Sequence, residues 1–297
     1  MYYFLSLLTG ILITVMVVFN GELTGQYGIY FATVIIHIAG LLLITAVVLI
    51  RRDKVFAVRY PAWLYLGGAI GVMTTVFNNL AFGRISVSAI LALGLLGQSA
   101  AGLTIDQFGF FGMQKHPFTK GKLVGLFLII GGIGIMVDNL EIVAVAVSFA
   151  AGVNIVLSRT LNAKLSNLTN VRVGTFFNYF VGLGVAAIVL LILGRGEAVF
   201  AAPIVTSWWI YFGGVLGVCV VLISNITVVK ISAFYLTLLI FIGKIFSGVL
   251  IDVIISNRLS LRNLTGGILV TIGLCVNLLM DRRKSYSPSQ PISASKL

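Results

Sequence analysis

A long internal repeat constrains the architecture of this chain more than any other feature of its sequence. Residues 63–106 align without a gap with residues 209–252, and a stretch near the N-terminus aligns in the same way with residues beyond 150. The identical positions include the pairs Trp63/Trp209, Gly68/Gly214, Asn79/Asn225, Gly97/Gly243, Asp106/Asp252, Gly10/Gly152, Asn20/Asn162 and Gly40/Gly182. Both halves should therefore fold into the same unit.

The composition is that of a membrane protein. Hydrophobic residues make up 59% of the chain and charged residues 9%, whereas about a quarter of the residues in soluble proteins are charged. Ten apolar runs are long enough to cross a hydrocarbon core of about 30 Å, and a backbone in lipid must satisfy its own hydrogen bonds, which predicts helices. We expect an all-α polytopic protein of the cell (inner or plasma) membrane. Its predicted spans are 2–20, 29–50, 61–82, 86–106, 122–139, 142–160, 171–194, 207–229, 232–255 and 263–280.

The basic residues predict how these spans are oriented. With the N-terminus in the cytoplasm, most of the 20 lysines and arginines fall on cytoplasmic segments, as the positive-inside rule requires. Each repeat has five spans, an odd number, so the second repeat must enter the membrane inverted relative to the first. We expect repeats at 1–140 and 141–280, both termini in the cytoplasm, and a disordered, polar tail at 281–297. Inverted repeats are typical of secondary transporters, whose site lies near the midplane between the repeats.

Several motifs carry a resemblance to a known family. Residues 94–112 read GLLGQSAAGLTIDQFGFFG and are followed by KLVGLFLIIGGIGIM, while WLYLGG opens span three. Together with Asn20 and Leu23, these motifs resemble the YdcZ-like branch of the drug/metabolite transporter superfamily, in which a five-helix unit occurs alone or fused in tandem. The resemblance implies ten helices in a 5+5 inverted arrangement and secondary transport, but no particular substrate. The second repeat departs from the pattern, because Lys244 stands where the first repeat has Gln98.

Lys244 is the most informative polar residue within a span. It lies in the middle of span nine, about 17 Å from either interface at 1.5 Å per residue, where an unpaired charge costs about 2.5–3.5 kcal/mol. Three interpretations would offset that cost: an anionic ligand or carboxylate partner, a neutral lysine that carries protons, or a lysine bonded to backbone carbonyls or to Gln98. Since ionisable groups at this depth are usually functional, we expect Lys244 to contact substrate.

Four further polar residues are candidates for the same site. Gln98 could line it or could form an interhelical hydrogen bond. His37 in span two and Tyr179 in span seven occupy equivalent positions, with Asn178 next to Tyr179. His37 could relay protons but is more often a packing residue, and tyrosine also packs routinely between helices.

Two acidic residues and two asparagines occupy equivalent positions near the predicted ends of spans. Inversion should place Asp106 and Asp252 on opposite sides of the membrane, where they act as gating or coupling groups or as simple helix-end charges. Asn20 and Asn162 are expected to be capping or interfacial residues.

Other function classes lack their motifs. There is no nucleotide-binding G-x-x-x-x-G-K-[ST], no nucleophile motif and no Cys/His/Asp cluster, so we expect no enzyme, no metal and no cofactor. The net charge of +12 is explained by cytoplasmic loops and does not require nucleic acid as a partner. The partners are then the lipid bilayer and a small-molecule substrate. The motif Gly121-x-x-x-Gly125, whose small residues let helices pack closely, is compatible with a homodimer.

Two interpretations of the whole chain remain. The first is a secondary transporter of a small polar metabolite, with the charge of Lys244 and the lack of a mid-membrane carboxylate favouring an anionic or carboxylate-bearing solute. The alternative is a non-transporting membrane scaffold or receptor, in which Lys244 is structural.

Overall fold

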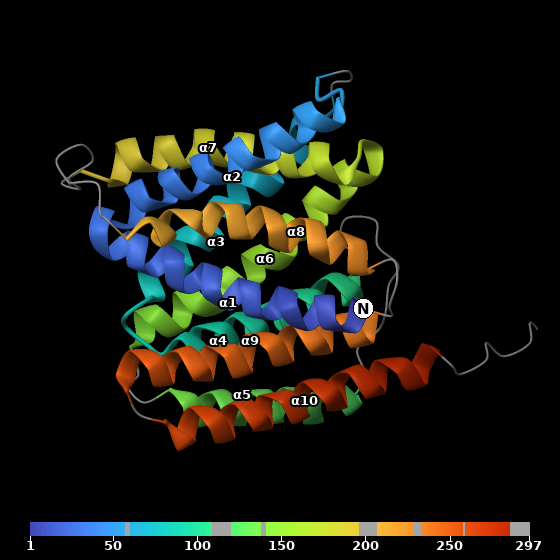
Figure 1. Cartoon of the computed structure of the whole chain (residues 1–297). Helices are drawn as coiled ribbons and strands as arrows, with labels where there is room; N and C mark the ends of the chain where they lie inside the picture. The colour runs from blue at the N-terminus through green and yellow to red at the C-terminus, as the bar shows by residue number, and fades with distance from the viewer. Residues whose placement is uncertain are drawn as a thin grey trace, which may run out of the picture.

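The computed structural model describes residues 1–56, 60–108, 120–137, 141–195, 207–228, 233–257 and 259–285, and within them the chain is a bundle of ten α-helices (Figure 1). Short 3₁₀ turns at Ala62–Tyr65 and Trp208–Phe212 lead into the third and eighth helices. The helices are α1 (Tyr2–Tyr27), α2 (Ile29–Arg51), α3 (Leu66–Ala81), α4 (Val87–Phe108), α5 (Lys120–Met136), α6 (Ile142–Leu168), α7 (Val171–Leu193), α8 (Gly213–Val228), α9 (Ala233–Ser256) and α10 (Leu261–Ser285).

Most of these helices are long and apolar enough to cross a bilayer. Seven meet that condition by length and composition, and Leu123–Met136, Trp208–Ser224 and Leu261–Asn277 are shorter apolar helices. Many of their large side chains are exposed on the outside of the bundle, including Phe127, Leu191 and Ile254, as expected for side chains that face lipid rather than water. The predicted all-α fold with ten transmembrane helices in a 5+5 repeat is confirmed.

The helices pair in a way that relates one repeat to the other. Three contacts join equivalent helices: α2 with α7, α4 with α9, and α5 with α10. The other large contacts come in matched sets, since α1 packs on α8 and α9 just as α6 packs on α3 and α4, and α2 packs on α8 just as α7 packs on α3. The core is therefore built between the repeats rather than within each of them, around a pseudo-two-fold axis.

Glycine pairs set the closest of these helix contacts. A Cβ atom on Gly10 of α1 would lie against the carbonyl oxygen of Ile240 in α9 and 2.9 Å from the Cα atom of Gly243. The equivalent pair is Gly152 of α6 and Gly97 of α4, where a Cβ atom on Gly97 would lie 3.1 Å from the Cα atom of Gly152. Since no larger residue fits without moving backbone, these glycines hold α1 to α9 and α6 to α4 in direct backbone contact.

Two helices are longer than their predicted spans. Helix α1 continues to Tyr27 and α6 to Leu168, well past the predicted ends at residues 20 and 160. Asn20 and Asn162 therefore lie inside helices, so the prediction that they cap helix ends was wrong. The physical reason is that both face protein: Asn20 is buried beside Gly213, and Asn162 lies beside Gly67.

The C-terminal helix also runs beyond its predicted span. Helix α10 ends at Ser285, so it includes the first residues of the tail that the sequence predicts to be disordered. The rest of that tail, residues 286–297, lies outside the described residues, as does most of the basic loop between α4 and α5.

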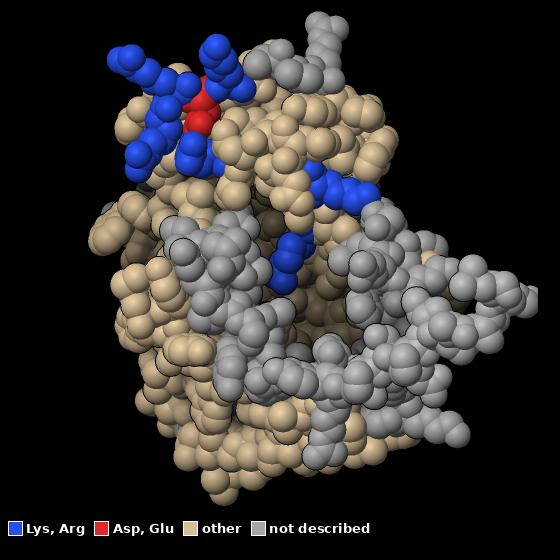
Figure 2. Space-filling view, turned by 90° about the vertical axis from the view of Figure 1, so that its right-hand side faces the viewer, with Lys and Arg blue, Asp and Glu red and all other residues tan. Residues whose placement is uncertain are grey.

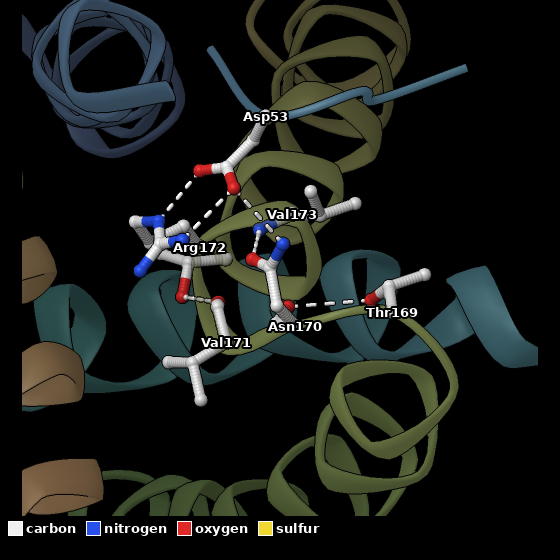
Figure 3. A network of polar contacts seen from close by, with 7 residues as sticks. Asp53, Thr169, Asn170, Val171, Arg172 and Val173 are labelled. Carbon is white, nitrogen blue, oxygen red and sulfur yellow. Dashed lines mark hydrogen bonds and ion pairs between the residues drawn. The ribbon is translucent and has the colours of Figure 1, made fainter. Parts of the chain in front are cut away.

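A polar network fastens the loop after α2 to the start of α7 (Figure 3). The Arg172 guanidinium donates through Nη2 to Asp53 Oδ1 at 2.9 Å and through Nε to Asp53 Oδ2 at 2.5 Å, while Asn170 Nδ2 donates to Oδ1 at 3.1 Å. Asn170 also caps α7, since its Oδ1 accepts from the backbone N–H of Val173 at 2.9 Å. The Arg172 guanidinium holds the pKa of Asp53 below its usual range, so this carboxylate is ionised at neutral pH.

Candidate functional site

Lys244 lies at the middle of α9 and is buried, with 7% of its surface exposed. Its backbone is fixed against α1, because the hydroxyl of Thr14 donates to the Lys244 carbonyl oxygen at 3.1 Å and Ser247 donates to Thr14 Oγ1 at 2.8 Å. Among the described residues, none makes a hydrogen bond or an ion pair with the Lys244 ammonium. The backbone of α9 is thus fixed at Lys244, while the ammonium group of Lys244 has no partner among the described residues.

Arg159 is a second cation within a helix, on α6. Helix α6 packs on α4, and α4 also packs on α9, which carries Lys244. The Arg159 side chain is exposed. Figure 2 shows a hollow in the face that carries the N-terminus, with basic atoms inside it.

The sequence places Arg159 on a cytoplasmic segment, because span six is predicted to end at residue 160. In the structure α6 continues for another eight residues to Leu168, so Arg159 lies inside the helix. The repeat predicts a position inside the helix for Arg159, because the equivalent residue in the first half is Val17, which is buried in the middle of α1.

Gln98 occupies the position in α4 that Lys244 occupies in α9. Its side-chain amide donates to the carbonyl oxygen of Gly94 at 3.2 Å, one turn earlier in the same helix. The interhelical hydrogen bond considered for this residue is therefore absent from the described contacts. Helix α4 packs against both α6 and α9, so Gln98 belongs to the helix between the two that carry Arg159 and Lys244.

His37 and Tyr179 meet at the contact between α2 and α7. Their ring centroids are 5.9 Å apart, and each ring covers a glycine of the partner helix, Gly182 under His37 and Gly40 under Tyr179. Both side chains are buried; His37 Nδ1 lies 2.7 Å from the Thr33 carbonyl oxygen, and the Tyr179 hydroxyl donates to the Gly214 carbonyl oxygen at 3.3 Å. Within the described residues, no hydrogen bond or ring contact joins this pair to Lys244 or Gln98.

Asn178 belongs to a different polar network, which joins α3, α6 and α7. Its Oδ1 accepts from Asn162 Nδ2 at 2.8 Å, and the same amide lies 3.2 Å from the Ser158 hydroxyl. Ser158 in turn donates to the carbonyl oxygen of Gly67 at 2.7 Å. The five residues predicted to form one site thus fall into separate groups: the His37–Tyr179 pair, the Asn178 network, and Lys244 and Gln98 at equivalent positions of α9 and α4.

Asp252 joins α9 to the N-terminus of α4. Its carboxylate accepts from the backbone N–H groups of Val87 at 2.8 Å and Ser88 at 3.0 Å, from the Ser88 hydroxyl, and from Asn263 Nδ2 at 3.3 Å. A carboxylate in this place satisfies N–H groups that have no partner in the helix and favours the positive end of its dipole. The side chain of Asp106, its equivalent in the first repeat, lies outside the described residues.

Helices α4 and α9 are in close contact near Asp252. Near Asp252, a Cβ atom on Gly248 would lie 3.1 Å from the Cα atom of Ser88. At the equivalent position in α4, a Cβ atom on Gly102 would meet no described atom within 4 Å. Among the described residues, the close contact at Gly248 thus has no counterpart at Gly102.

Comparisons with known proteins agree with this architecture. The sequence matches the family described as "Putative inner membrane exporter, YdcZ" twice, over residues 1–135 and again over residues 143–276. Chains of solved structures also match, 17 in number. One of them, described as "Crystal structure of protein", aligns with a TM-score of 0.65 and 16% identity over 94% of this chain and 98% of its own, a likeness that shows the fold alone. A search of curated proteins finds no match.

Proposed function

The chain belongs to the YdcZ family of inner membrane exporters, a family of multi-pass membrane transporters, and on this basis we propose that it carries a small anionic or carboxylate-bearing metabolite by alternating access. The substrate site lies near the midplane between the repeats, with Lys244 as its principal contact and Gln98 beside it. Two-fold pseudo-symmetry of the kind described above is what allows one site to face each side of the membrane in turn.

One observation carries the proposed charge of the substrate: the buried Lys244 ammonium has no hydrogen-bond or ion-pair partner among the described residues. An ammonium at the centre of a membrane helix costs about 2.5–3.5 kcal/mol if nothing offsets its charge. A bound anion would supply that offset, and its loss on release would leave the site ready for the next solute.

His37, Tyr179 and Asn178 support the site from a distance in this proposal. The His37–Tyr179 pair lies where α2 crosses α7, and the Asn178 network lies where α7 crosses α3. Because these crossings join the two repeats, their packing fixes how the repeats sit relative to one another. Their role is therefore to position helices rather than to contact the solute.

We further propose that the structure represents the state open to the cytoplasm. With both termini in the cytoplasm, the hollowed face in Figure 2 is the cytoplasmic one, and Asp252 closes the opposite side by capping α4. In the other state, Asp106 would cap α9 in the same way and Asp252 would release α4. A transported solute need only bind the two states with different affinities to shift their populations.

Solute flux in proteoliposomes tests the proposal. The reconstituted protein should carry labelled carboxylates but not a labelled amine or a neutral sugar. Lys244→Gln, which copies the first repeat, should abolish that flux, while Lys164→Gln should not, because Lys164 Nζ lies over the Trp63 ring, 5.5 Å from its centroid. Carboxylate flux that survives Lys244→Gln unchanged would show that the anion site is elsewhere, and flux confined to amines would show that the proposed charge is wrong.

A further inference from the structure

Basic side chains gather where α2 ends, α6 ends and α7 begins. Asp53, in the loop after α2, pairs with Arg172 of α7, and Lys164 of α6 lies with its Nζ 5.5 Å from the centroid of the Trp63 ring. Figure 2 shows a group of basic atoms around acidic ones near the top of that face. We call this group of side chains the basic patch, and its members are Arg51, Arg52, Lys54, Lys164 and Arg172.

The positive charge of the basic patch exceeds what the protein neutralises. Asp53 is the one acidic residue in the segments 51–65 and 160–176, and its carboxylate is already bound to Arg172. Among the described residues, no hydrogen bond or ion pair reaches the exposed side chains of Arg51, Arg52 and Lys54. The patch therefore presents several cations that are free to bind an anion.

Aromatic side chains next to the basic patch indicate its depth in the membrane. Phe56 is 72% exposed, while one edge of its ring packs on Phe177 with 5.7 Å between centroids. Tyr65 packs on the same ring at 4.8 Å, and Trp63, two residues earlier, is 44% exposed. Tryptophan and tyrosine are enriched where the hydrocarbon core meets the headgroups. The cations beside these rings therefore lie at the level of the lipid phosphates.

We infer that the basic patch binds the headgroup of an anionic phospholipid. Groups of about four to eight lysines and arginines directly beside a transmembrane helix attract acidic lipids, and each such charge near the surface contributes about fivefold to affinity. In the orientation proposed above, this end of α2 faces the cytoplasm, so the lipid belongs to the cytoplasmic leaflet. The inference does not depend on which solute the protein carries.

The second repeat lacks the same cluster of charge at the equivalent place. Residues 51–54 read RRDK, whereas the equivalent residues 193–196 read LGRG and contain a single basic residue. Because the two repeats enter the membrane in opposite orientations, the equivalent place lies on the other side. The lipid is thus bound in one leaflet and marks one side of an otherwise two-fold symmetric protein.

Trp63 provides a reporter beside the basic patch. In nanodiscs, phosphatidylglycerol brominated on its acyl chains should quench the fluorescence of a protein that keeps only Trp63, with Trp208→Phe and Trp209→Phe. Brominated phosphatidylcholine at the same mole fraction is the uncharged comparison. The ratio of the two quenching constants measures the preference of the site for an anionic lipid.

Trp208 provides the matched reporter at the other end of α2. The turn that carries it is joined to α1 by the hydrogen bond between the Tyr211 and Tyr27 hydroxyls, and the Tyr27 ring contacts Phe31 near the start of α2. Phe31 is 20 residues from Arg51, about 30 Å along the helix at 1.5 Å per residue. A protein that keeps only Trp208, with Trp63→Phe and Trp209→Phe, therefore reports on lipid far from the patch.

We expect phosphatidylglycerol to be preferred about 5- to 25-fold at Trp63, the contribution of one or two charges, and to be preferred little at Trp208. Arg51→Gln combined with Lys54→Gln should bring the ratio at Trp63 close to the ratio at Trp208. Arg84→Gln combined with Arg195→Gln removes two exposed charges from loops at the other end of the bundle and should leave the ratio at Trp63 unchanged.

A second measurement needs no tryptophan substitution. Native mass spectrometry of the full-length protein, in detergent with equal amounts of the two lipids, should detect bound phosphatidylglycerol on the wild type and less of it on the variant with Arg51→Gln and Lys54→Gln. Equal retention of both lipids by the wild type would overturn the inference.

Three other results would also count against it. A preference that is equal at Trp63 and Trp208 would show a general attraction with no local site. A preference at Trp63 that survives Arg51→Gln with Lys54→Gln would show that other groups bind the lipid. If an excess of soluble glycerol phosphate abolished the preference, the patch would bind a free phosphate compound rather than a membrane lipid.

Discussion

Replacing Asp252 with an uncharged residue should weaken the contact between α9 and the N-terminus of α4, which closes one side of the molecule in this structure. The carboxylate accepts from two backbone N–H groups and one hydroxyl at the start of α4, and these hydrogen bonds tie α9 to that helix end. Asp252→Asn keeps an acceptor oxygen but loses the charge, and charge-assisted hydrogen bonds are about twice as strong as neutral ones. Loss of an N-cap costs about 0.5–2 kcal/mol, so we expect the closed arrangement to lose about 1–2 kcal/mol, which changes its population ratio about 5- to 30-fold.

A cysteine reporter would measure this change. Leu91 is 4% exposed and packs beneath the same contact, since a Cβ atom on Gly248 would lie 3.2 Å from its Cδ1 atom. Leu91→Cys, in a background without Cys219 and Cys275, should react with a maleimide in nanodiscs about 5- to 30-fold faster when Asp252 is asparagine. Nanodiscs leave both faces accessible, so the result does not depend on orientation.

A matched control is available at Glu141. This acidic residue precedes α6 but makes no side-chain cap hydrogen bond, so Glu141→Gln should leave the labelling rate unchanged. The reasoning would be refuted if Asp252→Asn left the rate at the wild-type value while the protein remained folded, or if Glu141→Gln raised it equally.

Two further predictions concern stability. Gly97→Ala should destabilise the protein by about 1–3 kcal/mol in thermal unfolding, because the new Cβ atom would meet the carbonyl oxygen of Phe149. Gly102→Ala should be neutral or stabilising, since no described atom lies within 4 Å of the new Cβ atom. Equal melting temperatures of the two variants would contradict the close packing at Gly97. Asp53→Asn should lower the melting temperature at pH 7. That difference should narrow as the pH falls below about 4 and close below the lowered pKa of Asp53, because the ionised group stabilises the fold only above its folded-state pKa; a pH-independent difference would rule out the pairing with Arg172 as its source.

The sequence predicts the architecture well because repetition and hydropathy act over long stretches. The repeat and the odd number of spans per half lead to a 5+5 arrangement, and most span boundaries differ from the helices by a few residues. The largest differences are at the ends of α1 and α6, which contain polar residues that face neighbouring helices. A hydropathy pattern ends at such residues, although a helix buried in protein need not end there.

The site could be predicted only in part, for a related reason. Lys244 is conspicuous because a charge interrupts an otherwise apolar run, but Arg159 lies close to a predicted boundary, where a charge looks ordinary. The separation of Asn178 from Lys244 was not predictable either, because it depends on which face each helix turns toward its neighbours. That information comes from the packing of Gly67, Ser158 and Asn162.

The glycine contacts between the halves have a consequence for biogenesis. Helix α1 is held against α9, and α4 against α6, so the bare glycine faces of Gly10 and Gly97 have no covering helix until the second half of the chain has been synthesised. Co-translational insertion of the first five helices would then produce an incomplete intermediate that waits in the bilayer. Separately expressed halves should each be degraded when made alone, and they should assemble into a stable complex when made together in the same cell.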